Sequence, residues 1–194
     1  MLRSLWEQPV DEDTPALVTL AQGEKEKLGP EYGRHDVLLE QIPHWMFTFT
    51  NSGSDLLARS LAMITARPDC LQRVQAEIDA ASSLDQAASI HKLRYLEACL
   101  LETGRLYPPV SQTSHRASDN DEFEDKQIAA GSEILQVFSL NTRDQSQNPD
   151  ANHFRPERWL DADDPVHQRY PNLFLSGARA CPGKELILFV NTAA

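Results

Sequence analysis

The sequence contains no run of about 20 apolar residues, which is the length that a membrane-spanning helix needs. Residues 1–13 also lack the basic start and the apolar core of a signal peptide, so we expect a soluble, cytoplasmic chain. Basic residues are scarce, with 18 Lys and Arg against 29 Asp and Glu and a formal net charge of -11. This balance disfavours nucleic acid and anionic membranes as partners, and it is also typical of an ordinary solubilising surface.

Cysteine is scarce as well. Cys70, Cys99 and Cys181 are an odd number and show no Cys-x-x-Cys spacing, which argues against a disulfide scaffold and against a tetrahedral zinc site. The six histidines show no ligand spacing such as His-Glu-x-x-His. No glycine-rich loop has the pattern that binds phosphate.

The 194 residues are expected to form one mainly α domain with small β-sheets, an α+β fold. An apolar run predicts a long helix over about residues 43–66, and Pro68 starts a second helix that continues to about Ala81. A further helix over about residues 93–107 must end before Pro108, because proline cannot donate to the helical hydrogen bonds. Short strands are expected at residues 111–118, 126–128 and 133–140, followed by an irregular stretch over residues 141–173.

The segment from Phe174 to Gly183 presents one cysteine in a setting suited to binding iron. Cys181 precedes an apolar run that predicts a helix with Pro182 in its first turn. The free N–H groups and the positive end of the helix dipole favour an anion there, which supports a thiolate ligand. Gly177 and Gly183 permit backbone conformations that other residues resist and let a flat ring approach the main chain. The alternative is a buried cysteine in a glycine-rich turn before a helix.

The pattern Phe174-x-x-Gly177-x-Arg179-x-Cys181-x-Gly183 resembles the haem-binding loop of the cytochrome P450 family. Further segments resemble motifs of this family in the right order, from about Pro43 to the last residue. They are Leu100–Pro109, similar to the Glu-x-x-Arg helix; Asn141–Asp144, similar to the Asn/His-x-Arg-Asp turn; and Phe154–Trp159, similar to the Pro-Glu-Arg-Phe segment with Trp159 in place of the common Phe. The chain resembles only the C-terminal half of the family's members. We interpret this chain as a member of the soluble bacterial type. We therefore expect the C-terminal part of the cytochrome P450 fold, truncated at both ends, in a fragment of a longer protein.

The resemblance implies a haem b cofactor held through the Cys181 thiolate. Phe174, Gly177, Arg179, Cys181 and Gly183 are the expected cofactor-binding residues of the loop. Arg179 is expected to pair with an anionic group such as a ligand carboxylate. Arg116, which follows the first expected strand, occupies the place where the family often sets a basic residue against a haem propionate, and a surface arginine is the alternative.

Glu102 and Arg105 are three residues apart on the predicted helix, so their side chains share a face and can meet. By itself such a spacing is most often a solvated pair worth ~0–1 kcal/mol. The resemblance implies that both join Arg158 in a buried structural network that holds the cysteine loop in place.

The long helix departs from the family pattern where an acid-alcohol pair is usual. Asn51 occupies the acid position and Ser52 the alcohol position, and an amide cannot ionise to relay a proton. Thr50, Asn51 and Ser52 are the candidate catalytic residues, with Thr50 and Ser52 expected to organise water. The alternative is that these hydroxyls bond to the preceding turn of their own helix.

The resemblance implies a haem-thiolate oxidoreductase that hydroxylates a small apolar organic substrate with O2. Electrons are expected from a separate redox protein of the ferredoxin or flavoprotein type. Two alternatives remain, a peroxide-using or peroxide-rearranging relative that lacks the acid-alcohol pair, and a non-catalytic truncated fragment.

Overall fold

The computed structural model describes residues 35–81, 87–146, 148–164, 171–177 and 180–194. It divides into two units, residues 1–51 and residues 52–194. Helix α3 (His35–Thr48) is followed along the chain by a π-helical turn, η1 (Phe49–Gly53), and then by α4 (Ser54–Thr65). The helix expected to start near residue 43 therefore starts earlier, and Pro43 lies inside α3. Proline removes one N–H donor there without ending the helix.

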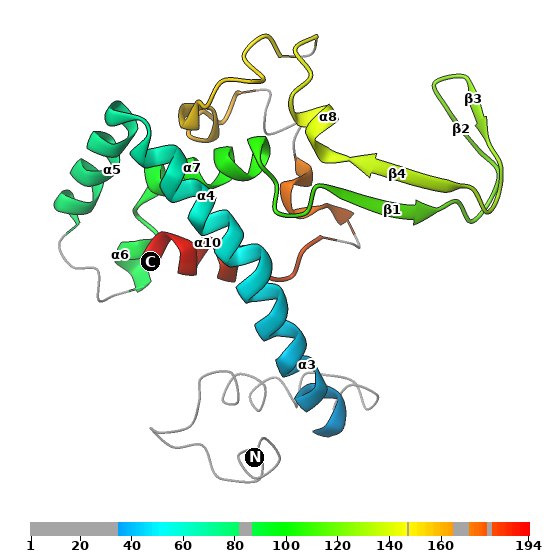
Figure 1. Cartoon of the computed structure of the whole chain (residues 1–194), viewed down its shortest axis with the longest axis horizontal. Coiled ribbons are helices and arrows are strands. Elements are labelled where there is room, and N and C mark those ends of the chain that lie inside the picture. Colours follow the sequence, from blue (N-terminus) through cyan, green and yellow to red (C-terminus); the bar gives the residue numbers. More distant parts are fainter. Residues whose placement is uncertain (1–34, 82–86, 147, 165–170, 178–179) are drawn as a thin grey trace. The chain divides into compact units, whose positions relative to one another are not determined.

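Helices α4, α5 (Pro68–Ala80) and α7 (Arg94–Leu106) enclose a hydrophobic cluster of the second unit. Its buried members are Ile64 from α4, Val74 from α5, and Tyr95 and Cys99 from α7. Figure 1 shows α7 in green beside α4 and α10 (Lys184–Ala193). From Ala98 to Leu106 all residues of α7 except Leu101 are buried, so this helix is the centre of the unit.

Both ends of α7 are bound by side chains from other elements. At its start, the Glu77 carboxylate of α5 accepts the backbone N–H groups of Tyr95 at 2.8 Å and Leu96 at 2.9 Å. An anion at this position satisfies free donors and complements the helix dipole. At its end, Arg143 donates to the carbonyl oxygen of Leu106 from Nη2 at 2.6 Å and from Nε at 3.1 Å.

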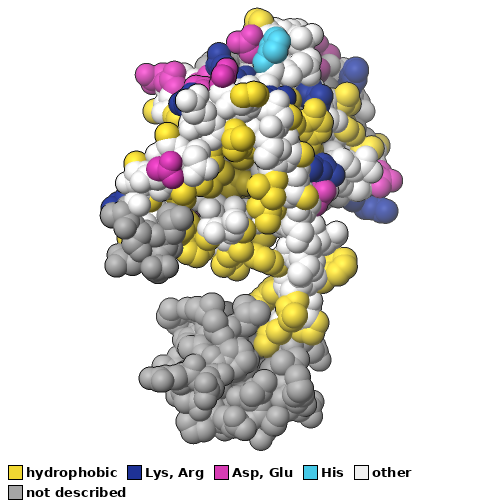
Figure 2. Space-filling view, turned by 60° about the vertical axis from the view of Figure 1, so that its left-hand side comes forward, with side chains coloured by type: hydrophobic (Ala, Val, Ile, Leu, Met, Phe, Trp, Pro, Cys, Tyr) yellow, Lys and Arg dark blue, Asp and Glu magenta, His cyan; other side chains and the backbone are white. Residues whose placement is uncertain are grey.

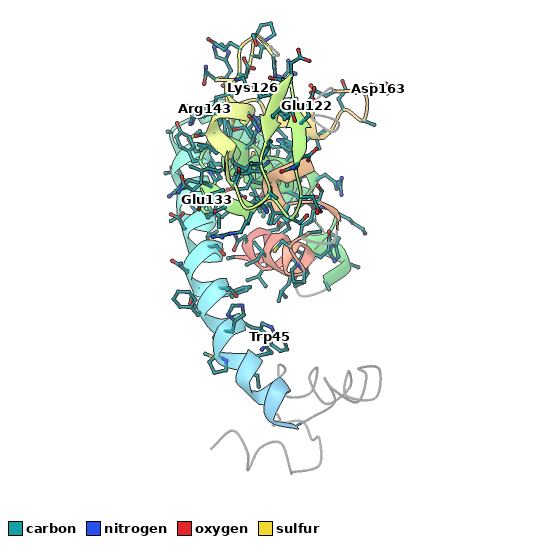
Figure 3. The ribbon with its side chains drawn as sticks, turned by 90° about the vertical axis from the view of Figure 1, so that its right-hand side faces the viewer. Trp45, Glu122, Lys126, Glu133, Arg143 and Asp163 are labelled. Carbon is teal, nitrogen blue, oxygen red and sulfur yellow. The ribbon has the colours of Figure 1, made fainter. Side chains whose placement is uncertain are left out.

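The strands form two small antiparallel pairs. β1 (Gln112–Arg116) pairs with β4 (Glu133–Val137), and β2 (Asp121–Phe123) pairs with β3 (Lys126–Ile128). Figure 1 shows the β1–β4 ribbon extending away from the helices with the β2–β3 hairpin at its far end, and Figure 3 labels Glu122 and Lys126 on that hairpin. Glu124 and Asp125 both have positive φ values, 47° and 62°, which the two-residue hairpin turn requires.

The strand expected over residues 133–140 ends at Val137, because the helical turn α8 (Phe138–Thr142) begins there. The expected irregular stretch contains two short 3-10 helices, η2 (Pro156–Trp159) and η3 (Pro171–Phe174). A short helix, α6 (Ala87–Ile90), precedes α7. Among the residues that the structure describes, no helix has the length and apolar character needed to cross a membrane.

We predict that Cys99 resists thiol-alkylating reagents in the folded chain at pH 8. Its side chain is fully buried, and burial, with smaller contributions from nearby Cys70 and Glu157, raises the pKa of the Cys99 thiol from 9.0 to about 12. The reactive thiolate is therefore scarce at Cys99, whereas Cys181 is exposed and Cys70 is partly exposed. Mass mapping after iodoacetamide treatment of the haem-free chain should find Cys99 modified only after denaturation. Labelling of native Cys99 as fast as that of Cys70 would contradict this burial.

Candidate functional site

The side chains of Glu102 and Arg105 form a fully buried ion pair on α7, with exposed fractions of 0% for both. Arg105 donates from Nε to Glu102 Oε2 at 2.8 Å and from Nη2 to Glu102 Oε1 at 2.7 Å. Two parallel contacts of this kind are the strong bidentate geometry of a guanidinium with a carboxylate. The three-residue spacing thus produces a buried pair and not a solvated one.

Glu102 accepts three further hydrogen bonds from the segment that contains η2. The backbone N–H of Arg155 and Nε of Arg158 donate to Oε1, at 3.0 and 3.1 Å. The indole N–H of Trp159 donates to Oε2 at 2.9 Å. A carboxylate tolerates burial when its charge is paired and its oxygens accept hydrogen bonds, and Glu102 meets both conditions.

The two buried guanidinium groups also bind backbone carbonyl oxygens of the stretch that precedes η2. The acceptors are Thr142 (2.6 Å), Ala151 (2.7 Å) and His153 (3.2 Å) for Arg105, and Asp150 (3.2 Å) for Arg158. Within the described part of the chain, Nη1 of Arg158 has no hydrogen-bond partner. A stretch with little regular secondary structure is thereby fixed to α7 through charge-assisted hydrogen bonds.

The loop that carries Cys181 closes on itself through backbone hydrogen bonds. The N–H of Cys181 donates to the carbonyl oxygen of Phe174 at 2.7 Å, and the N–H of Ala180 donates to that of Gly177 at 3.1 Å. Gly177 has φ +62°, the left-handed region that glycine adopts without strain, as the sequence led us to expect. Leu175 has φ +60°, an uncommon conformation for a residue with a branched side chain.

The structure corrects the expected helix start beside Cys181. α10 begins at Lys184 with Gly183 as its N-cap residue, so Pro182 lies before the helix and not in its first turn. Gly183 has φ −88°, which any residue adopts, and a Cβ placed on it would meet Cys181 Sγ at an ordinary 3.9 Å. Neither the backbone conformation nor local crowding therefore requires glycine at this position.

Cys181 lines two cavities of different character. One, of about 200 Å³, has no charged side chain among its described lining residues. These residues are Ser52, Leu56, Pro108, Pro109, Val110, Thr113, Phe138, Leu173, Phe174, Leu175, Cys181 and Ile187. The other, of about 450 Å³, is lined in part by Arg94, Glu97, Trp159 and Lys184. Figure 2 shows hydrophobic side chains gathered across the middle of one face, with most charged side chains toward its edges.

The three candidate catalytic residues have different surroundings. Ser52 lines the apolar cavity together with Cys181. The hydroxyl of Thr50 instead donates to the carbonyl oxygens of Met46 at 2.7 Å and Phe47 at 3.2 Å, in the preceding turn of its own helix. Asn51 is exposed and is the last residue of the first unit.

Of the two expected cofactor-binding arginines, only Arg116 lies among the described residues. Arg116 is exposed on β1, where its backbone lies opposite Glu133 of β4, and it is absent from the described linings of both cavities. Figure 3 labels Glu133. Arg179 lies outside the residues that the structure describes. Phe174 lines both cavities beside Cys181.

Trp159 and Arg155 complete the network around Glu102 but were not expected from the sequence. Arg155 acts through its backbone N–H, which carries no sequence signal. For Trp159 a signal existed, because tryptophan replaces the phenylalanine that is common in the similar motif, and tryptophan alone of the two has a donor. Arg59 was also missed; it donates from α4 to the carbonyl oxygen of Tyr107 at 3.0 Å, next to the cavity wall at Pro108.

The chain is similar to known proteins along most of its length. A family model described as Cytochrome P450 matches residues 12–187. Beta-amyrin 24-hydroxylase of Glycine max is 34% identical over 74% of this chain and 30% of its own length. Probable cytochrome P450 4d20 of Drosophila melanogaster is 31% identical over 75% of this chain and 30% of its own length. The cytochrome P450 monooxygenase mpsF of Macrophomina phaseolina is 33% identical over 73% of this chain and 36% of its own length.

A solved structure shows the same fold. The crystal structure of a cytochrome P450 named CYP102L1 superposes with a TM-score of 0.81 at 20% sequence identity, covering 97% of this chain and 44% of that one. The chain spans about a third of the length of the curated relatives named above. The expected partial fold is confirmed. These relatives come from a plant, an insect and a fungus, so the bacterial, soluble type stays a prediction.

We predict that Glu102→Ala lowers the free energy of unfolding by about 3–5 kcal/mol, because it leaves two buried guanidinium groups without their shared counter-charge. Glu97→Ala on the same helix is the matched control. Glu97 pairs only loosely with the exposed Arg94, at 3.8 Å, and its loss should cost about 0–1 kcal/mol. Urea denaturation followed by circular dichroism measures both, and equal losses would show that the network does not stabilise the fold.

Proposed function

Because the chain belongs to the cytochrome P450 family, a family of haem-thiolate monooxygenases, we propose that Cys181 is the thiolate ligand of haem b. The whole protein then hydroxylates a small apolar organic substrate with O2. Its electrons come from a separate redox protein of the ferredoxin or flavoprotein type. The reaction takes place in the cytoplasm. The observation that carries this proposal is the free, exposed thiol of Cys181 at the edge of an apolar cavity.

The described residues fit such a cofactor. The thiol is the donor that this ligation needs. The cavity beside it has no charged side chain among its described lining residues, so a flat apolar ring can pack there without burying an unpaired charge. At about 200 Å³ the cavity is below the ~300–1,000 Å³ of typical ligand pockets, so these residues form one side of the site and not its full enclosure. Haem held by a cysteine thiolate supplies O2 activation, because the sulfur donates electron density that favours O–O cleavage.

In this proposal the residues of the chain bind and orient the substrate, and they exclude water from it. Leu56, Val110 and Phe138 contribute an apolar wall that favours an apolar substrate over water. Ser52 is a hydroxyl on this wall, and we assign it to hold a water molecule at the site. Thr50 is not assigned this role, because it is absent from the described linings of both cavities.

A second candidate is a peroxide-using or peroxide-rearranging relative. It is favoured by Asn51, because an amide cannot ionise. Asn51 therefore cannot act as the general acid that normally delivers protons for O–O cleavage when O2 is the oxidant. A peroxide brings its own O–O bond at the reduced level and needs no electron donor.

We predict that the reduced chain, supplied with haem, gives the carbon monoxide difference band of thiolate-ligated haem at about 450 nm. Cys181→Ser should abolish this band, because serine provides no thiolate. Cys70→Ser is the matched control and should retain it, since Cys70 lies on α5 and is absent from the described linings of both cavities. Absence of the band from the unsubstituted chain would overturn the proposal that this chain holds haem through Cys181. If the band is present, turnover with an electron-transfer system, compared with turnover with a hydroperoxide, decides between the two enzymes.

A further inference from the structure

Trp159 makes a contact that the common phenylalanine of the similar motif has no atom to make. Its indole N–H donates to Glu102 Oε2 at 2.9 Å. On this oxygen the indole is one of two donors within the described chain, the other being Nε of Arg105 at 2.8 Å. Because the Glu102 side chain is fully buried, no bulk solvent replaces a donor that is lost.

The same side chain reaches the surroundings of Cys181. Trp159 lines the cavity of about 450 Å³ together with Leu173, Phe174 and Cys181. Phe174 in turn accepts the backbone N–H of Cys181 at 2.7 Å. Trp159 therefore contacts the buried Glu102 carboxylate through its indole N–H, and it lines the same cavity as the cysteine loop.

We propose that Trp159 is a positioning residue that couples the Glu102 network to the Cys181 loop, with its N–H fixed on Glu102 and its ring forming part of the wall beside Cys181. The coupling sets the position and exposure of the thiol. The effect on haem ligation rests on the proposed function, whereas the coupling itself is a property of the chain without haem.

The first test is hydrogen exchange of the indole N–H groups in a ¹H–¹⁵N spectrum of the full chain, with the Trp159 signal assigned by its loss in Trp159→Phe. The Trp159 proton should exchange more slowly than that of Trp45, which projects from α3 (Figure 3) and whose indole nitrogen has no hydrogen bond among the described residues. Both exchange rates are measured in the unsubstituted chain, so the comparison does not depend on whether a variant folds. Exchange as fast as at Trp45 overturns the proposal.

The second test compares Trp159→Phe with the matched control Trp45→Phe, each of which replaces an indole by a phenyl ring. Trp159→Phe should lower the melting temperature by roughly 4–8 °C, since it removes a hydrogen bond to a charged group. It should also change the alkylation rate of Cys181 several-fold, which a purely local loss of stability at η2 would not do. Trp45→Phe should change neither quantity. Equal alkylation rates in the two variants overturn the coupling.

In the haem-loaded protein, Trp159→Phe should move part of the carbon monoxide difference band away from the thiolate position while Trp45→Phe leaves it in place. If the unsubstituted chain gives no thiolate band, the proposed function fails, and the exchange and alkylation results still decide the role of Trp159.

Discussion

A carboxylate removed from water has to be surrounded by donors and counter-charge, and this requirement at Glu102 organises the unit formed by residues 52–194. The donors come from α7 itself through Arg105 and from the η2 segment through Arg158 and Trp159. The two arginines then extend the network to carbonyl groups before η2. A stretch with little hydrophobic core of its own is thereby held against the central helix by charge and hydrogen bonds.

Cys181 lies where two chemically different surroundings meet. On one side the described lining residues are mostly apolar and carry no charge. On the other side they include Arg94, Glu97 and Lys184. An apolar side suits a flat ring and an organic substrate, and a charged side suits contact with solvent or with another protein. The loop keeps the thiol between them through backbone hydrogen bonds from Ala180 and Cys181.

Much of the fold could be predicted from the sequence, because proline positions and apolar periodicity are local signals. The three-residue spacing of Glu102 and Arg105 predicted only that the two side chains can meet, and their burial with Arg158 was implied by the family resemblance. Pro68 and Pro108 bound helices as expected. Pro43 misled the prediction of a helix start, since a proline inside a helix looks the same in the sequence as one that begins it. The backbone donor of Arg155 and the cap from Glu77 depend on contacts between distant segments, which no local pattern encodes.

The long sequence separation within the Glu102 network has a kinetic consequence. Glu102 and Trp159 are 57 positions apart, so the chain must close a loop of that length before the carboxylate gains its full set of donors. Closing such a loop costs chain entropy before the contacts are gained, so we expect these contacts to form after the local helix α7. During synthesis, α7 leaves the ribosome before η2. The Glu102 and Arg105 side chains of α7 therefore stay solvated until the η2 segment has been synthesised. A nascent chain interrupted before residue 155 would therefore expose α7 to chaperones and proteases, because burying Glu102 without the η2 donors would be unfavourable.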